Sequence, residues 1–308
     1  MKLQNVVHSQ QFDIKTLDEL FAMAREMEII AKNGSNLLTG KIMGTLFYEP
    51  STRTRMSFES AMLKLGGNVI STENAKEFSS ATKGETVEDT IRVMEGYVDV
   101  IVMRHYREGS AERAAQTTHI PFINAGDGTG QHPTQALLDL YTIQKELGKI
   151  NGISIAMVGD LAHGRTVRSL AYLLAKYKGI KIYFVAPKSV KMNQDIKMYL
   201  KKHKIEFIEE DSLKIVAPKV DVIYQTRIQR ERFVEKENLE EYEEAHGKYI
   251  IDNSILDIMK SNSIIMHPLP RAGEIRKEVD SDPRAAYFRQ AQNGLYLRMA
   301  LLKALLVG

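Results

Sequence analysis

The sequence predicts an α/β fold with two doubly wound domains, each built on a parallel sheet. The chain has 308 residues, the length of two ordinary domains. Short apolar segments alternate with amphipathic segments, as in βαβ units. The alternation stops at residues 148–152, which read Gly-Lys-Ile-Asn-Gly, and then restarts. We therefore predict domains at 1–149 and 150–285, a C-terminal helix at 286–308 that completes the first, and an active-site cleft between them.

In the first half, four short apolar segments have the length of strands. They lie at residues 41–48, 66–72, 98–104 and 121–126. Apolar residues at helical spacing predict helices before, between and after these strands. The helices are expected at residues 16–32, 86–97 and 132–149, with one more that begins just after Pro50 and has its apolar face at residues 58, 61, 62 and 65. Strands that alternate with helices in this way indicate a sheet of short, buried, parallel strands.

The second half repeats the pattern. Strands are expected at residues 152–160, 180–187, 220–226 and 263–270. Helices are expected at residues 166–177, 194–203 and 285–306. The last helix has apolar residues on more than one side, so we expect it to pack between elements or to return to the first domain.

Composition excludes several classes of protein. The net charge is only +3, from 42 basic and 39 acidic residues, which argues against a nucleic-acid surface. No apolar run approaches the roughly 20 residues of a membrane span, and the N-terminal residues lack the apolar core of a signal peptide. The absence of cysteine excludes disulfides and thiolate metal sites. We expect a cytoplasmic protein.

The most informative segment is EPSTRTRMSFES, residues 49–60. Three hydroxyls and two arginines occupy residues 51–55, immediately before apolar residues at helical spacing. A serine or threonine at this position often only caps the helix. Capping explains one hydroxyl, but it leaves two arginines at the positive end of the helix dipole. A bound anion would relieve that conflict, so we interpret the segment as a phosphate-binding turn.

Other polar residues follow predicted strands, where this fold places its chemistry. Arg104 directly follows one strand; a surface arginine that caps the strand is the simpler explanation. His132 and Gln135 lie three apart at a helix start behind a glycine-rich loop, which favours ligand contact. The segment MHPLPR, taken alone, indicates a rigid structural turn, and the Ser79 to Lys83 loop is a weak signal by itself.

In the second domain, Arg165 follows the first predicted strand within VGDLAHGRTVRS. That segment lacks both the G-x-G-x-x-G pattern and the Lys-Ser or Lys-Thr pair of a P-loop, which argues against NAD or ATP binding. Arg227 and Gln229 alternate along an extended segment and therefore face one side. Such a pair suits recognition of a carboxylate.

Taken together, these stretches resemble the carbamoyltransferase family, in particular the catalytic chains of its aspartate branch. The resemblance runs in order through FYEPSTRTRMSFE, SSATKGET, HPTQALLDLYTI, VGDLAHGRTVRSL, YQTRIQRERF and MHPLPR to the C-terminal helix. It implies transfer of a carbamoyl group from carbamoyl phosphate to the amino group of L-aspartate. The products are N-carbamoyl-L-aspartate and phosphate, in de novo pyrimidine biosynthesis. The resemblance implies no cofactor and no metal.

The resemblance also implies roles for individual residues. The phosphate would be bound by Ser51, Thr52, Arg53 and Thr54. Arg104 would bridge the phosphate and the carbonyl oxygen, His132 and Thr54 would polarise that carbonyl, and Gln135 would contact the carbamoyl nitrogen.

For the second substrate, the resemblance implies that Lys83, Arg165, Arg227 and Gln229 bind L-aspartate. Backbone carbonyls of the Pro268, Leu269 and Pro270 turn would orient the amines. Glu49 would pair with Arg165 and Arg232 as the domains close.

Family members are trimers, so the resemblance further implies a homotrimer with shared active sites. Ser79 and Lys83 would then reach into the site of a neighbouring subunit, where Lys83 would act in catalysis. Association with a regulatory chain in a larger complex is an additional expectation, and no nucleic-acid or membrane partner is expected.

Two alternatives remain. The ornithine branch of the family carries a cysteine in the turn that corresponds to MHPLP, and this chain has none. A non-catalytic homologue would have lost residues of the phosphate turn or the arginine and histidine positions, which are intact here.

Overall fold

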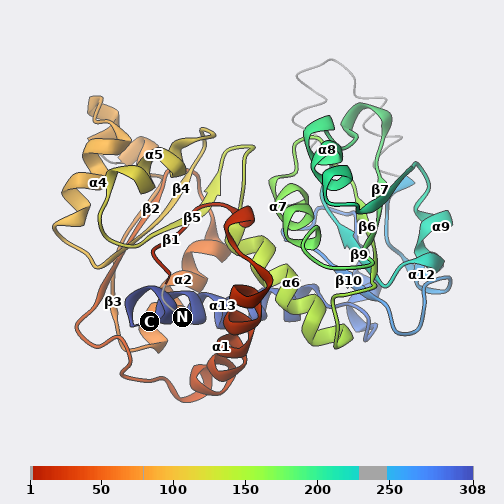
Figure 1. Cartoon of the computed structure of the whole chain (residues 1–308), viewed down its shortest axis with the longest axis horizontal. Coiled ribbons are helices and arrows are strands. Elements are labelled where there is room, and N and C mark those ends of the chain that lie inside the picture. The colour runs from red at the N-terminus through yellow and green to blue at the C-terminus, as the bar shows by residue number, and fades with distance from the viewer. Residues whose placement is uncertain (1–2, 79, 229–247, 308) are drawn as a thin grey trace. The chain divides into compact units, whose positions relative to one another are not determined.

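The computed structural model describes residues 3–78, 80–228 and 248–307 (Figure 1). Contacts between residues divide the chain into two compact units. Unit 1 comprises Met1–Leu138 and Gln292–Gly308, and unit 2 comprises Asp139–Ala291. Each unit contains a five-stranded sheet in which every pairing of named strands is parallel. The predicted α/β class with two parallel sheets is therefore confirmed.

The sheet of unit 1 has the strand order β1-β5-β4-β2-β3. Its strands are β1 (Asn5–Val6), β2 (Ile42–Phe47), β3 (Asn68–Glu73), β4 (Val100–His105) and β5 (Phe122–Asp127). Its helices are α1 (Ile14–Asn33), α2 (Thr52–Lys64), α3 (Ala75–Phe78), α4 (Val87–Glu95) and α5 (Ser110–Thr117), with short 3-10 turns at Ser9–Gln11 and Ser80–Lys83. Helices α6 (Pro133–Leu147) and α13 (Tyr287–Leu306) contribute residues to both units.

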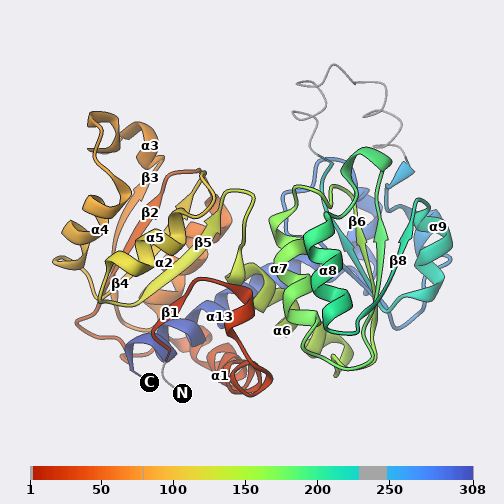
Figure 2. The same cartoon turned by 45° about the horizontal axis from the view of Figure 1, so that its top comes forward.

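Helices cover both faces of this sheet (Figure 2). Helices α4 and α5 pack together against β4 and β5, whereas α1 packs on α2, which lies on β2 and β3. Side chains of β2 alternate between these layers: Leu46 joins the apolar cluster under α4 and α5, and the Thr45 hydroxyl contacts Glu59 of α2. The expectation of buried strands is wrong for β3, which is an edge strand with several exposed side chains.

The sheet of unit 2 has the order β10-β9-β6-β7-β8. Its strands are β6 (Ser154–Val158), β7 (Lys181–Val185), β8 (Glu206–Glu210), β9 (Val222–Gln225) and β10 (Ile264–Met266). Its helices are α7 (Arg165–Leu174), α8 (Gln194–Lys202), α9 (Leu213–Val216) and α12 (Asn253–Leu256). Figure 1 shows α7 and α8 on one face of the sheet and α9 and α12 on the other.

Each sheet has a point where the strand order reverses, and ligands of such folds bind outside the carboxyl ends of the strands there. In unit 1 this point lies between β2 and β4, and in unit 2 it lies between β6 and β9. The strands on either side end at Phe47 and His105, and at Val158 and Gln225. Among the residues that the structure describes, no helix is long and apolar enough to cross a membrane.

Candidate active site

The predicted phosphate turn lies at the point of reversal in unit 1, between β2 and α2. The carbonyl of Ser51 accepts the first helical hydrogen bond, from the N–H of Arg55 at 3.1 Å. The Ser51 side chain makes no capping hydrogen bond to α2 and instead accepts from Nη1 of Arg104 at 3.2 Å. The simple capping explanation is therefore wrong for Ser51. The Ser51 hydroxyl therefore leaves the N–H groups at the start of α2 uncapped, and such groups favour a bound anion.

The two arginines of this turn have different environments. Arg55 forms ion pairs with Glu59 at 3.3 Å and with Glu73 of β3 at 2.8 Å, so its charge is balanced within the protein. Arg53 is exposed, and it makes no hydrogen bond or ion pair with the described residues. Partial burial lowers the pKa of Arg53, in keeping with a cation that lacks a carboxylate beside it. Arg53 is thus the cation of this turn that is available to an external anion.

Arg104, at the end of β4, lies beside the same turn because β4 pairs with β2. Its guanidinium donates to both carboxylate oxygens of Glu49, with Nη2 at 2.9 Å and Nε at 3.3 Å. The Arg104 side chain is only 12% exposed. A planar guanidinium held on two sides by Glu49 and Ser51 is fixed in direction, as a group that recognises one substrate atom must be.

His132 and Gln135 are both buried where α6 begins. The His132 carbonyl accepts from the N–H groups of Gln135 and Ala136, so it closes the first helical turn that Pro133 opens. The hydroxyl of Thr134 lies 3.4 Å from Nδ1 of His132. The loop from β5 to α6 therefore brings both predicted carbamoyl ligands into the first turn of one helix.

His105 is a residue near this site that the sequence analysis did not interpret. Burial lowers its pKa to about 4. Its Nδ1 accepts the N–H of Arg107 at 3.0 Å, and its ring lies against Tyr48 and Tyr106. His105 is therefore neutral near pH 7 and supports the end of β4 next to Arg104. Only its position after an apolar strand could have indicated this role.

The remaining predicted residues of unit 1 lie in the phosphate turn or in the turn after α3, and some predicted residues of the chain are outside the described part. Lys83 is exposed at the end of the 3-10 turn that follows β3 and α3. Thr52 is exposed and Thr54 is buried in the first turn of α2. Three predicted residues lie outside the described residues: Ser79, Gln229 and Arg232.

In unit 2, Arg165 and Arg227 flank the point of strand reversal. Arg165 is the first residue of α7, which follows β6, and Arg227 follows β9. The two strand ends are bound to each other, because Thr226 donates to the Val158 carbonyl through both its N–H and its hydroxyl at 2.8 Å. A Cβ on Gly159 would lie 2.4 Å from the Thr226 carbonyl oxygen, so this close approach requires glycine.

The MHPLPR turn follows β10, the neighbour of β9 in the sheet. Pro268 and Leu269 are half-buried, Pro270 is exposed, and the peptide bond between Leu269 and Pro270 is cis. His267 and Glu274, which the sequence analysis did not assign, are buried side chains whose Nε2 and Oε1 atoms lie 2.7 Å apart.

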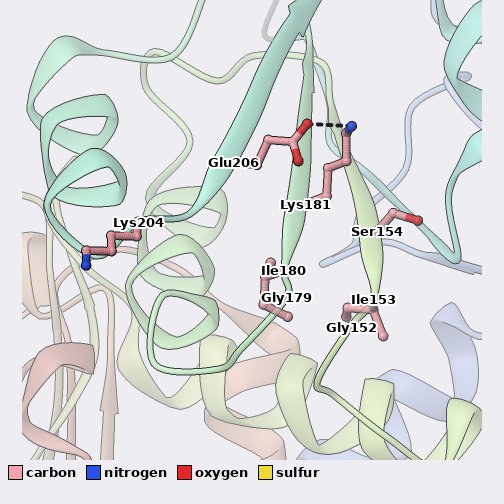
Figure 3. A pocket seen from close by; sticks show the side chains of 8 residues that line it. All are labelled: Gly152, Ile153, Ser154, Gly179, Ile180, Lys181, Lys204 and Glu206. Atoms are coloured by element: carbon pink, nitrogen blue, oxygen red, sulfur yellow. Dashed lines mark ion pairs between the residues drawn. The ribbon is translucent and has the colours of Figure 1, made fainter.

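A separate pocket of about 410 Å³ lies at the opposite, amino-terminal ends of β6, β7 and β8. It is lined by Gly152, Ile153, Ser154, Gly179, Ile180, Lys181, Lys204 and Glu206. Figure 3 shows Lys181 paired with Glu206 and Lys204 directed away from that pair. The pocket contains none of the predicted site residues.

Each unit is a parallel α/β unit with cationic side chains at its point of strand reversal. The chain therefore belongs to the class of α/β proteins that bind ligands at the carboxyl ends of their strands. The comparisons with known families specify the class further. A model of the aspartate/ornithine carbamoyltransferase carbamoyl-P binding domain matches residues 4–145, and a model of the Asp/Orn binding domain of the same family matches residues 151–305. The chain belongs to the aspartate/ornithine carbamoyltransferase family, as its motifs predicted.

Individual relatives are similar over the whole chain. A chloroplastic aspartate carbamoyltransferase of Arabidopsis thaliana is 64% identical over all of this chain and 79% of its own length. Aspartate carbamoyltransferase 1 of Pisum sativum, also chloroplastic, is 62% identical over all of this chain and 80% of its own length. The crystal structure of Trypanosoma cruzi aspartate transcarbamoylase with carbamoyl phosphate has a TM-score of 0.94 at 42% identity, covering 99% of this chain and 97% of that one.

The comparisons contradict the predicted cytoplasmic location, because the Arabidopsis and pea relatives are named as chloroplastic proteins. The prediction depended on the composition of the chain and on the pattern of its first printed residues. Those features do not identify the compartment in which a protein works.

Proposed function

We propose that this chain is an aspartate carbamoyltransferase, which transfers the carbamoyl group of carbamoyl phosphate to the amino group of L-aspartate in pyrimidine biosynthesis. The observation that carries the proposal is Arg53, a cation at the start of α2 without a partner among the described residues, beside Arg104 and Ser51. Structures of the Trypanosoma cruzi relative with carbamoyl phosphate, and with carbamoyl aspartate and phosphate, support the same substrate and products.

We propose the residue roles that the family resemblance implies, and the chemistry of the reaction is consistent with them. The aspartate nitrogen attacks the carbamoyl carbon, the bond from that carbon to the phosphate oxygen breaks, and the leaving phosphate accepts the amine proton. Negative charge develops on the carbonyl oxygen, where Thr54, Arg104 and His132 would donate hydrogen bonds. Ser51, Thr52 and Arg53 would hold the phosphate, and Gln135 the carbamoyl nitrogen. Catalysis would then consist of positioning and electrostatic stabilisation.

Aspartate binding is assigned to unit 2 together with a neighbouring subunit. Arg165, Arg227 and Gln229 would bind the two carboxylates, and the carbonyls of Pro268 and Leu269, in the turn that ends with Pro270, would orient the amines. We propose residues 1–149 with 286–308 as the carbamoyl-phosphate domain and 150–285 as the aspartate domain, separated by an active-site cleft. Pairing of Glu49 with Arg165 and Arg232 would close them.

The direct test is incubation of the protein with carbamoyl phosphate and either L-aspartate or L-ornithine. We expect carbamoylated aspartate and an equal amount of phosphate, and no carbamoylated ornithine, because paired arginines match an acceptor with two carboxylates. Product from ornithine alone would support the other branch of the family. No product from either acceptor would support a non-catalytic homologue.

We also propose a homotrimer in which Ser79 and Lys83 complete the site of a neighbouring subunit. Unit 1 exposes apolar side chains that a subunit contact could cover, among them Met56, Leu63 and Ile70, each at least 50% exposed. Met56 and Leu63 lie two turns apart on α2, and Ile70 lies on the edge strand β3, which precedes α3 and the turn that ends at Lys83. Association with a regulatory chain stays a prediction, which the size of the complex in a native extract would test.

Mixing Lys83→Ala and Arg53→Ala trimers, each inactive alone, tests the shared site. After subunit exchange, about one site in four would combine an intact Arg53 with an intact Lys83 from a neighbour. We therefore expect recovery of about a quarter of wild-type activity. Zero recovery, with exchange demonstrated by mass spectrometry of tagged subunits, would argue against sharing.

A further inference from the structure

The turn after β10 has a backbone that needs support. Leu269 has a φ of +49°, in the left-handed region that residues with a Cβ seldom adopt. Pro268 and Pro270 have no N–H group, so Leu269 carries the single backbone donor among these three residues. The partner of that N–H therefore decides how the turn is held.

That partner is the buried side chain of His267. The N–H of Leu269 donates to Nδ1 of His267 at 2.7 Å, and the His267 residue is 2% exposed. A backbone N–H can only donate, so Nδ1 must carry a lone pair and the proton of the neutral ring must be on Nε2. Nε2 in turn donates to Oε1 of Glu274 at 2.7 Å. Both ring nitrogens are thus engaged, and a single tautomer is fixed.

Glu274 connects the residue before the turn, His267, with the chain after it. Its second oxygen accepts the N–H of Ala272 at 2.8 Å, so one carboxylate holds both His267 and the chain beyond Pro270. Burial opposes its charge, but the hydrogen bonds from His267 and the backbone hold the pKa of Glu274 below its usual range. Glu274 therefore accepts from His267 as a carboxylate.

A second buried carboxylate ties this turn to β9. The N–H of His267 donates to Gln290 at 2.8 Å, and the Gln290 amide donates to Oδ1 of Asp139 at 2.6 Å. The hydroxyl of Tyr224 donates to Oδ2 of Asp139 at 2.7 Å. Burial and the Asp139 charge raise the pKa of Tyr224 well above its usual value, so Tyr224 keeps its proton. Tyr224 lies three residues before Arg227, so Asp139 fastens both segments that are assigned to aspartate.

We infer that His267 is a positioning residue for aspartate binding, which acts by fixing the backbone of Leu269 through its Nδ1 atom. The inference depends on the proposed function, in which the carbonyls of Pro268 and Leu269 orient the substrate amine. Loss of the Nδ1 acceptor would leave the Leu269 N–H without its partner and let those carbonyls turn away. The bond to Glu274 holds the ring but is not itself the contact that shapes the turn.

Two substitutions of His267 distinguish the role of Nδ1 from the role of Nε2. In His267→Asn, the amide oxygen reaches about where Nδ1 lies and can still accept from Leu269. In His267→Gln, the longer amide reaches about where Nε2 lies and can donate to Glu274, but the acceptor for Leu269 is lost. We expect His267→Gln to raise the KM for L-aspartate by about 10- to 100-fold, the effect of one unsatisfied buried amide. His267→Asn should stay within about threefold of wild type.

Three controls make this result specific. The KM for carbamoyl phosphate should not change in either variant, and His203→Gln, at an exposed histidine of unit 2, should be neutral. Thermal unfolding should show His267→Asn to be the less stable variant, because it leaves Glu274 without its histidine donor. His267→Asn would then be the less stable variant, whereas His267→Gln would bind aspartate more weakly. A histidine with only a structural role would lose stability and affinity in the same variant.

Hydrogen exchange of the turn gives a readout that does not need activity. In a peptide that spans His267 to Pro270, Leu269 carries the single backbone amide N–H, because His267 is the peptide's N-terminus and the two prolines have none. We expect slow exchange in the wild type and His267→Asn, and fast exchange in His267→Gln. If wild type fails to carbamoylate aspartate, the proposed function is wrong, and this exchange pattern still supports the Leu269 contact. Wild-type KM for aspartate or slow exchange in His267→Gln would overturn the inference.

Discussion

Replacing Arg53 with alanine is expected to lower kcat for carbamoyl transfer by about 1,000-fold, the upper range for loss of one preorganised donor at developing charge. Arg53 makes no hydrogen bond or ion pair with the described residues, so its removal breaks no polar contact there. The free energy of unfolding should therefore change by less than about 0.5 kcal/mol. Initial rates at saturating substrates, together with chemical denaturation, would measure both quantities.

Two further variants define what the arginine provides. Arg53→Lys keeps the charge but loses the planar, bidentate donor, so we expect it to regain only part of the lost activity. Arg92→Ala removes an exposed arginine of unit 1 and should leave kcat unchanged. If Arg53→Ala kept a third or more of wild-type kcat, Arg53 would not be the phosphate ligand that we propose.

The contrast between Arg53 and Arg55 shows what the sequence could not predict about the turn. Both arginines adjoin a helix start, where a cation is unfavourable, and the residue pattern alone did not distinguish them; only the family resemblance selected Arg53. Arg55 is balanced by Glu73, which is 18 residues away and comes within 2.8 Å only because β3 pairs with β2. Which cation remains for a ligand is therefore decided by strand pairing, which local sequence does not encode.

The fold was predictable where apolar residues mark an element. Each predicted strand has a counterpart in the sheets, and all of these except the edge strand β3 are mostly buried apolar segments, as expected of strands covered on both faces. The analysis missed β8, whose sequence EFIEE is acidic because it is an edge strand in contact with water. It also missed α5, a helix of eight residues with the sequence SAERAAQT and little apolar content.

The candidate site was predictable for a related reason. Parallel strands end at one edge of a sheet, so polar residues that follow neighbouring strands come together, as Ser51 and Arg104 do. The buried network of Asp139, Gln290 and His267 gave no such signal. Asp139 and Gln290 are 151 residues apart and lie within α6 and α13, where neither follows a strand or a turn that would single it out.

Replacing Arg227 with alanine is expected to raise the KM for L-aspartate by about 100-fold, because an unpaired substrate carboxylate costs about 2–5 kcal/mol in a desolvated site. The KM for carbamoyl phosphate should change by less than about twofold, since its proposed ligands Ser51, Arg53 and Arg104 are unaltered. Binding of N-(phosphonacetyl)-L-aspartic acid, which is present in a structure of the Trypanosoma cruzi relative, should weaken in parallel. Steady-state kinetics and calorimetry would measure these effects.

A matched variant separates loss of a ligand from loss of positive charge. Arg168 lies on α7 of the same unit and is paired with Asp195, so Arg168→Ala removes one arginine without removing a proposed ligand. It should leave the KM for aspartate within about twofold of wild type, because a partly exposed pair contributes little. Equal increases in the KM for aspartate in both variants would indicate that unit 2 attracts aspartate through its overall positive electrostatic potential. An increase confined to Arg227→Ala would require a direct contact with the carboxylate.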